Sequence, residues 1–112
     1  IQLKFNMSDL NQQKWRSQLE SEEDFIILDV RTSEEFEQLK LPNSTNIDFY
    51  NPQNFIQELE KLDKNKSYYV YCRTGSRSAN TCVLMKEMGF SKTYNLLGGI
   101  TEWEGEIEGQ NK

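Results

Sequence analysis

The feature that most constrains the fold is an alternation of short apolar runs with helix-like segments along the chain. Residues Phe25–Val30 form an apolar run interrupted only by Asp29, which is typical of a strand covered on both faces. Residues Ser67–Tyr71 are rich in aromatic side chains and predict a second strand. Because helical patterns separate such runs about five times, the sequence predicts an α/β domain with a parallel sheet between helices.

Capping and turn residues mark the expected ends of the other elements. Helix starts are expected at Ser8, at Thr32 with Glu35 in a capping box, and at Asn51 with Pro52. Further strands are expected at Leu3–Phe5, Thr45–Asp48 and Thr93–Leu96. Gly89 is expected to end the helix that follows Ser67–Tyr71, with Phe90 folding back on Met85. Residues 105–112 are polar and are expected to be a frayed tail, which leaves residues 1–104 as the domain.

The composition excludes several classes of function. The 112 residues fit one domain, and a net charge of −5 argues against nucleic-acid binding. No apolar run approaches the roughly 20 residues of a membrane-spanning helix, and no secretory signal is visible. The absence of histidine excludes Cys-His and Ser-His catalysis within the chain, and neither a metal nor a cofactor is expected. We therefore expect a cytoplasmic monomer with no membrane segment and no nucleic-acid partner.

A cysteine follows the second of these strands in the sequence Cys72-Arg73-Thr74-Gly75-Ser76-Arg77. Gly75 allows the backbone to curl so that successive N–H groups face one anion, and the helix expected from Ser76 adds the positive end of its dipole. These features lower a thiol pKa into the range of roughly 3.5–7.5 found for activated cysteines. The sequence therefore predicts that Cys72 is a thiolate nucleophile at the carboxyl end of a strand, where sites form in parallel sheets.

Other residues have simpler interpretations. Cys82 lies on the shoulder of an apolar helix face, and we interpret it as a core residue rather than as a resolving thiol. Asp29 and Arg31 also follow a strand, and a paired acid-base role is open. The favoured interpretation is structural, with Arg31 anchoring acids such as Glu35. Cys72 alone would also be interpreted as a core residue, but the arginines and the glycine after it favour a functional loop.

In addition to these patterns, the chain resembles single-domain rhodaneses from about Phe5 to Trp103. The matching parts occur in the family's order: Leu28-Asp29-Val30-Arg31, Glu35-Phe36, Pro42, Asn46-Ile47, Cys72 to Ser78, Met88-Gly89-Phe90, Tyr94 to Ile100, and Trp103. The resemblance implies a three-layer α/β/α fold with a five-stranded parallel sheet in the order 3-2-4-5-1. It also implies that Cys72 carries a sulfane sulfur as a persulfide, held by the loop residues Arg73, Thr74, Gly75, Ser76 and Arg77.

The resemblance further implies the partners of the reaction. The donor would be thiosulfate or a related compound, and the acceptor would be cyanide, a thiol or a protein. Arg73 is expected to attract the anionic donor, whereas Arg77 is expected to brace the loop and close the cradle around the sulfur. The chain has Leu39-Lys40-Leu41-Pro42-Asn43-Ser44 where the family often has Gly-His-Ile-Pro-Gly-Ala. Because Lys40 replaces the histidine, we expect altered local packing or acceptor contacts with activity kept, and the donor preference stays open.

Two alternatives remain open. The phosphatase and arsenate reductase branch of this fold places one more residue between the cysteine and the arginine than the four found here. The leaving-group acid that such phosphatases need is not identifiable in this sequence. The second alternative is a non-catalytic binding module, although rhodanese-like domains without catalysis often lack the cysteine that this chain retains.

Overall fold

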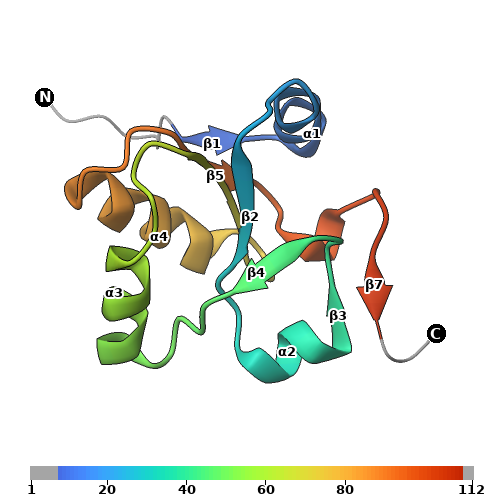
Figure 1. The fold of residues 1–112 in the computed structure, drawn as a ribbon. Coiled ribbons are helices and arrows are strands. Elements are labelled where there is room, and N and C mark those ends of the chain that lie inside the picture. Colours follow the sequence, from blue (N-terminus) through green and yellow to red (C-terminus); the bar gives the residue numbers. More distant parts are fainter. Residues whose placement is uncertain (1–7, 110–112) are drawn as a thin grey trace, which may run out of the picture.

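Five strands form one parallel sheet in the computed structural model, which describes residues 8–109 (Figure 1). They are β1 (Asp9–Leu10), β2 (Phe25–Asp29), β4 (Ser44–Asn46), β5 (Ser67–Tyr71) and β6 (Thr93–Leu96). The sheet order is β1-β6-β5-β2-β4, which is 3-2-4-5-1 when these five strands are counted along the chain. The expected α/β class and parallel sheet are therefore confirmed.

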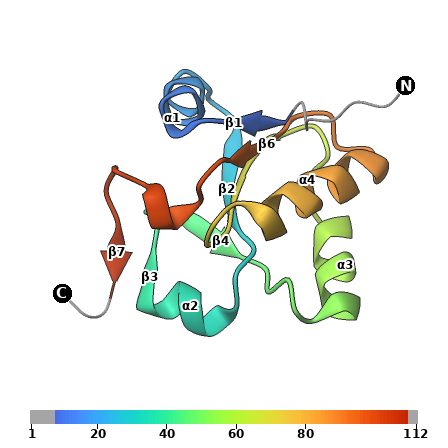
Figure 2. The same cartoon turned by 180° about the vertical axis from the view of Figure 1, so that it is seen from behind.

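Helical segments cover both faces of this sheet. Within residues 8–109 they are α1 (Gln12–Glu20), α2 (Ser33–Gln38), α3 (Pro52–Glu60), α4 (Ser76–Glu87) and the 3-10 helix η1 (Ile100–Glu102). α1 and η1 lie on one face of the sheet, and α3 and α4 lie on the other (Figure 2). In the same part of the chain, no helix is long and apolar enough to cross a membrane.

Each face of the sheet has its own hydrophobic core. Phe55, Leu59 and Met85 are buried on the face covered by α3 and α4, whereas Trp15 of α1 is buried with Tyr69 on the opposite face. β5 is buried along its whole length, which explains its apolar sequence. Burial of each large apolar side chain contributes about 1.5–3 kcal/mol. The two cores therefore fix the position of the carboxyl end of β5.

The starts of α1 and α2 show one correct and one wrong prediction. The capping box of α2 is present: the Glu35 amide donates to Thr32 Oγ1 at 3.2 Å, and the Thr32 amide donates to Glu35 Oε1 at 2.9 Å. The predicted cap at Ser8 is wrong, because Asn11 caps α1 and accepts from the Lys14 amide at 2.9 Å. The residues between Ser8 and Asn11 include β1, which pairs with β6. The helix therefore begins only after this strand.

The other helix ends largely follow the expected turn chemistry. Asn51 and Pro52 stand at the N-cap and first helical positions of α3, but the Asn51 side chain makes no capping hydrogen bond. Gly89 has φ 105° just after α4, and the Phe90 amide donates to Met85 O at 2.9 Å. The bond confirms the expected fold-back of Phe90 on Met85. The chain can reverse here because glycine adopts a positive φ without strain.

Three strand predictions at the ends and middle of the chain have different outcomes. Leu3–Phe5 lies outside the described residues, Thr93–Leu96 is confirmed as β6, and the strand expected at Thr45–Asp48 begins one residue earlier as β4.

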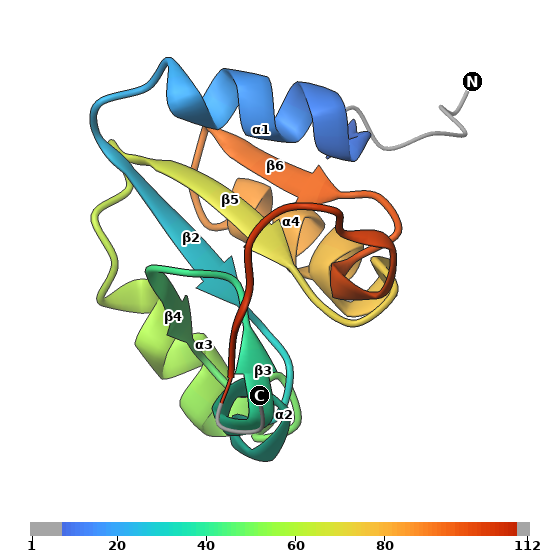
Figure 3. The same ribbon diagram turned by 90° about the vertical axis from the view of Figure 1, so that its right-hand side faces the viewer.

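The expectation of a frayed C-terminal tail is wrong for β7 (Glu108–Gly109), which pairs antiparallel with β3 (Leu39–Lys40). Figure 3 shows the segment after η1 crossing the strands to reach β3.

Candidate functional site

Hydrogen-bond donors from two residues of the following loop and helix contact the sulfur atom of Cys72. This residue directly follows β5, and a short loop then leads into α4. The Sγ atom accepts hydrogen bonds from the Gly75 amide at 3.1 Å, the Ser78 amide at 3.4 Å and the Ser78 hydroxyl at 3.3 Å. Gly75 has φ 107°, which permits the curl that turns its amide toward the sulfur. Cys72 itself has no exposed surface.

The outer side of the loop is fixed by η1. The Ile100 amide donates to Cys72 O at 3.0 Å, and the Thr101 amide donates to Arg73 O at 3.1 Å. The Thr101 hydroxyl also donates to Arg73 O, at 2.7 Å. These bonds satisfy the carbonyl groups at the start of the loop and hold its backbone in place, while the Gly75 and Ser78 amides donate to the sulfur.

The two cysteines differ in acidity because their hydrogen bonds differ. Burial raises the pKa of the Cys72 thiol, but hydrogen bonds from the Ser78 hydroxyl and from the amides of Ser78, Gly75 and Thr74 lower it below its ordinary value. Burial raises the pKa of Cys82 to about 12. Cys82 is fully buried, so its predicted place in the core is confirmed. Cys72 is therefore the more acidic of the two thiols.

Arg77 braces the loop through an ion pair with α2. Its Nη1 atom lies 3.1 Å from Glu35 Oε1, and its guanidinium group lies 5.4 Å from the centre of the Tyr50 ring. Burial opposes the ionisation of Glu35, but hydrogen bonds from Arg77 and Thr32 lower the Glu35 pKa to about 2. The carboxylate is thus charged at neutral pH, and the ion pair holds the start of α4 against α2.

Arg31 forms its ion pair with a different acid from the one expected from the sequence. Arg31 does not anchor Glu35; its Nη2 lies 2.6 Å from Asp29 Oδ2, and the same atom donates to Leu39 O at 2.5 Å. Asn46 Nδ2 donates to Asp29 O and Arg31 O, both at 3.0 Å. Asp29 is fully buried and Arg31 is nearly so. Their contacts fit the favoured structural role, because they hold together the chain after β2, β3 and β4.

The remaining loop residues predicted from the sequence point outward. Arg73, Thr74 and Ser76 are exposed, and within residues 8–109 the Arg73 side chain makes no ion pair. The Thr74 amide donates to the sulfur and so helps to lower the Cys72 pKa. Arg73 therefore leaves an unpaired positive charge in the loop that carries Cys72, which agrees with a role in attracting anions.

Two residues near the sulfur were missed as candidate site residues. Ser78 is the third residue of α4, where backbone N–H groups lack partners within the helix. This position was the signal that could have identified Ser78 as a donor to the sulfur. Asn95 of β6 donates from Nδ2 to Gly75 O at 3.3 Å and to Asp9 Oδ1 at 2.8 Å. Only the pairing of β5 with β6 brings Asn95 to the loop.

Replacing Ser78 with alanine is expected to raise the pKa of Cys72, because the thiolate loses its hydroxyl donor. A hydrogen bond to a charged group contributes about 1.5–3 kcal/mol, so the thiolate population at a pH below the Cys72 pKa should fall at least about tenfold. Ultraviolet absorbance of the thiolate during a pH titration measures this change. Ser76→Ala is the matched control, since Ser76 is exposed in the same helical turn. Equal titration of Ser78→Ala and wild type would contradict the role of this hydroxyl.

The segment that contains Lys40 keeps a tight turn despite its unusual sequence. Lys40 Nζ lies 4.5 Å from the centre of the Phe36 ring, and Lys40 pairs in register with Glu108 of β7. Asn43 stands where the family often has glycine and adopts φ 64°. Asparagine tolerates this left-handed conformation better than most residues. The local packing around Lys40 thus involves α2 and β7.

Known proteins resemble this chain in both sequence and fold. The family model described as a rhodanese-like domain matches residues 11–106. YtwF of Bacillus subtilis is 36% identical over 96 residues, covering 86% of this chain and 89% of that protein. Thiosulfate sulfurtransferase GlpE of Coxiella burnetii is 31% identical over 87 residues, covering 78% of each chain. The crystal structure of a rhodanese-like domain protein from Staphylococcus aureus superposes with a TM-score of 0.77 at 28% identity, covering 93% of this chain and 99% of the other.

Proposed function

This chain belongs to the rhodanese-like family, and we propose that it transfers a sulfane sulfur through a persulfide on Cys72. Relatives named as sulfurtransferases support a role in sulfur transfer. The observation that carries the assignment to Cys72 is the set of hydrogen bonds from Gly75 and Ser78 to its sulfur. Such donors favour the thiolate, which is the nucleophilic form of cysteine.

The first step of the proposed reaction loads the sulfur. The Cys72 thiolate attacks the outer sulfur of thiosulfate, so that a bond forms from Sγ to this sulfur. The S–S bond of thiosulfate breaks, and sulfite leaves with its electron pair. The transferred sulfur then lies about 2 Å beyond Sγ and is the new site of negative charge. The loop amides and the unpaired charge of Arg73 suit this anion and its anionic donor.

The second step returns the cysteine to its starting state. A thiolate or cyanide attacks the outer sulfur, and the electron pair of the Sγ–S bond returns to Cys72 as the thiolate. Neither step needs a proton to be removed by a base, because both the nucleophile and the leaving group are anions. The absence of histidine from the chain is therefore compatible with this reaction.

Intact-mass spectrometry tests the proposal on the wild-type protein. Incubation with thiosulfate is expected to add the mass of one sulfur atom, and cyanide is expected to remove it as thiocyanate. Peptide mapping should locate the added sulfur on Cys72. Hydrolysis of an aryl phosphate without any mass gain would instead support the phosphatase alternative. Neither mass gain from several donors nor hydrolysis would support a non-catalytic binding module.

A further inference from the structure

Both tryptophans of the chain line a cavity of about 480 Å³ on the face of the sheet covered by α1. The cavity lies between α1, the turn after β3 and the segment that joins η1 to β7. Its apolar wall is formed by Trp15, Leu19, Ile27, Leu41, Pro42 and Trp103. This volume falls within the range of about 300–1,000 Å³ that is typical of small-molecule sites. Cys72 belongs to the core on the other face, so the cavity is separate from the sulfur site.

Trp103, which is partly exposed, presents carbon surface rather than a hydrogen-bond donor to an occupant, whereas Trp15 is only 1% exposed. Trp15 Nε1 donates to Tyr94 O at 3.2 Å, and Trp103 Nε1 donates to Glu106 O at 3.0 Å. The two indole rings meet edge to face, with centroids 5.5 Å apart. Because both indole N–H groups already have partners, the apolar wall favours an aromatic ring without polar atoms of its own.

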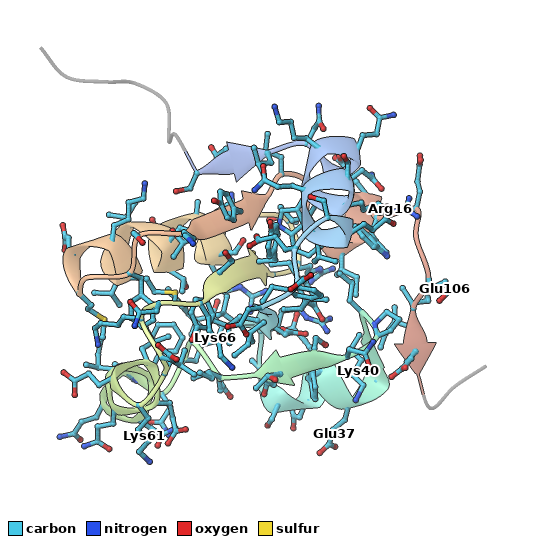
Figure 4. The ribbon with its side chains drawn as sticks, turned by 45° about the horizontal axis from the view of Figure 1, so that its top comes forward. Arg16, Glu37, Lys40, Lys61, Lys66 and Glu106 are labelled. Atoms are coloured by element: carbon cyan, nitrogen blue, oxygen red, sulfur yellow. The ribbon has the colours of Figure 1, made fainter. Side chains whose placement is uncertain are left out.

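The charged side chains around the cavity favour a cationic occupant. Glu20 of α1 and Glu106 of the facing segment line it, and within residues 8–109 neither carboxylate forms an ion pair or a hydrogen bond. Figure 4 shows Arg16 on α1 and Glu106 on the segment that leads to β7. The Arg16 guanidinium lies 5.2 Å from the centre of the Trp103 ring, so a cation already stacks on this ring. Two carboxylates against one guanidinium, in a chain of net charge −5, favour a positive ligand.

We propose that this cavity binds a small aromatic amine, with the ring against the apolar wall and the ammonium group at Glu20 and Glu106. The ring gains the burial of apolar surface, and the ammonium group gains two carboxylate partners that form no ion pair within residues 8–109. This site is independent of sulfur transfer, since none of its residues bonds to Cys72 Sγ.

Titration with 2-phenylethylamine tests the proposal, with tryptophan fluorescence as the signal because both tryptophans line the cavity. The emission is expected to change saturably. The matched anion 3-phenylpropionate has the same ring and a similar length, and it should bind at least about tenfold more weakly, which corresponds to about 1.4 kcal/mol. No saturable change with the amine, or equal binding of the anion, would overturn the proposal.

Charge-removing variants test where the ammonium group binds. Glu106→Gln and Glu20→Gln should each weaken binding of 2-phenylethylamine about fivefold, as expected for the loss of one partly screened charge. Glu104→Gln is the matched control, because Glu104 is an exposed acid in the same segment that does not line the cavity. Circular dichroism checks that each variant is folded. An equal loss in Glu104→Gln would show only a general charge effect and would reject the site.

Discussion

Replacing Cys72 with serine is expected to abolish sulfur loading completely while the domain stays folded. The serine hydroxyl is neutral at physiological pH and cannot form the persulfide that stores the sulfur between the two steps. The smaller oxygen still meets the donors of Gly75 and Ser78, so the loop retains hydrogen-bond partners. The measurements are intact mass after incubation with thiosulfate and thiocyanate formation after addition of cyanide.

Cys82→Ser is the matched control for this experiment. The variant places a hydroxyl in a largely apolar core beside Thr93, which offers it one hydrogen-bond partner, so the free energy of unfolding should fall by at most about 1–3 kcal/mol. It should nevertheless gain one sulfur atom from thiosulfate, since Cys82 lies away from the loop donors and its thiol has a pKa of about 12. A mass gain that survives in Cys72→Ser and disappears in Cys82→Ser would reverse the assignment.

Features that depend on residues close together in the sequence could be predicted. The capping box needs only Thr32 and Glu35, which face each other once one helical turn forms. The loop after Cys72 is also local, because a strand end, a glycine and a helix start follow one another directly. Their order determines which N–H groups converge on the sulfur, so the sequence alone predicts the main part of the candidate site.

Contacts between distant segments could not be predicted in this way. Glu35 lies 42 positions before Arg77, while Arg31 is a much nearer cation in the sequence. Arg31 instead pairs with Asp29, and this choice depends on how β2, β3 and β4 meet. The C-terminal pairing had no signal either, because β3 and β7 have two residues each, too few to show strand periodicity.

Gly99→Ala is expected to be among the most destabilising single substitutions and to impair sulfur loading as well. Gly99 has φ 59° and ψ −162°, a backbone conformation that is essentially restricted to glycine. A Cβ atom there would lie 2.3 Å from Arg73 O and 2.6 Å from Cys72 O. Both are backbone atoms that hold the loop to η1, so a rotamer change cannot relieve the clash. The backbone strain and the clash together should cost about 3–4 kcal/mol.

Chemical denaturation and thiosulfate loading, measured on the same variant, distinguish the two effects of Gly99→Ala. Gly89→Ala is the matched control, because it also replaces a glycine of positive φ, at 105°, but its Cβ would meet only the Lys64 side chain at 3.4 Å. That variant should lose about 1–2 kcal/mol and load sulfur normally. If Gly99→Ala were as stable as Gly89→Ala, the close contact of Gly99 with the Cys72 and Arg73 carbonyls would not support the loop. If it were unstable but loaded sulfur fully, the loop donors would not need η1 to position them.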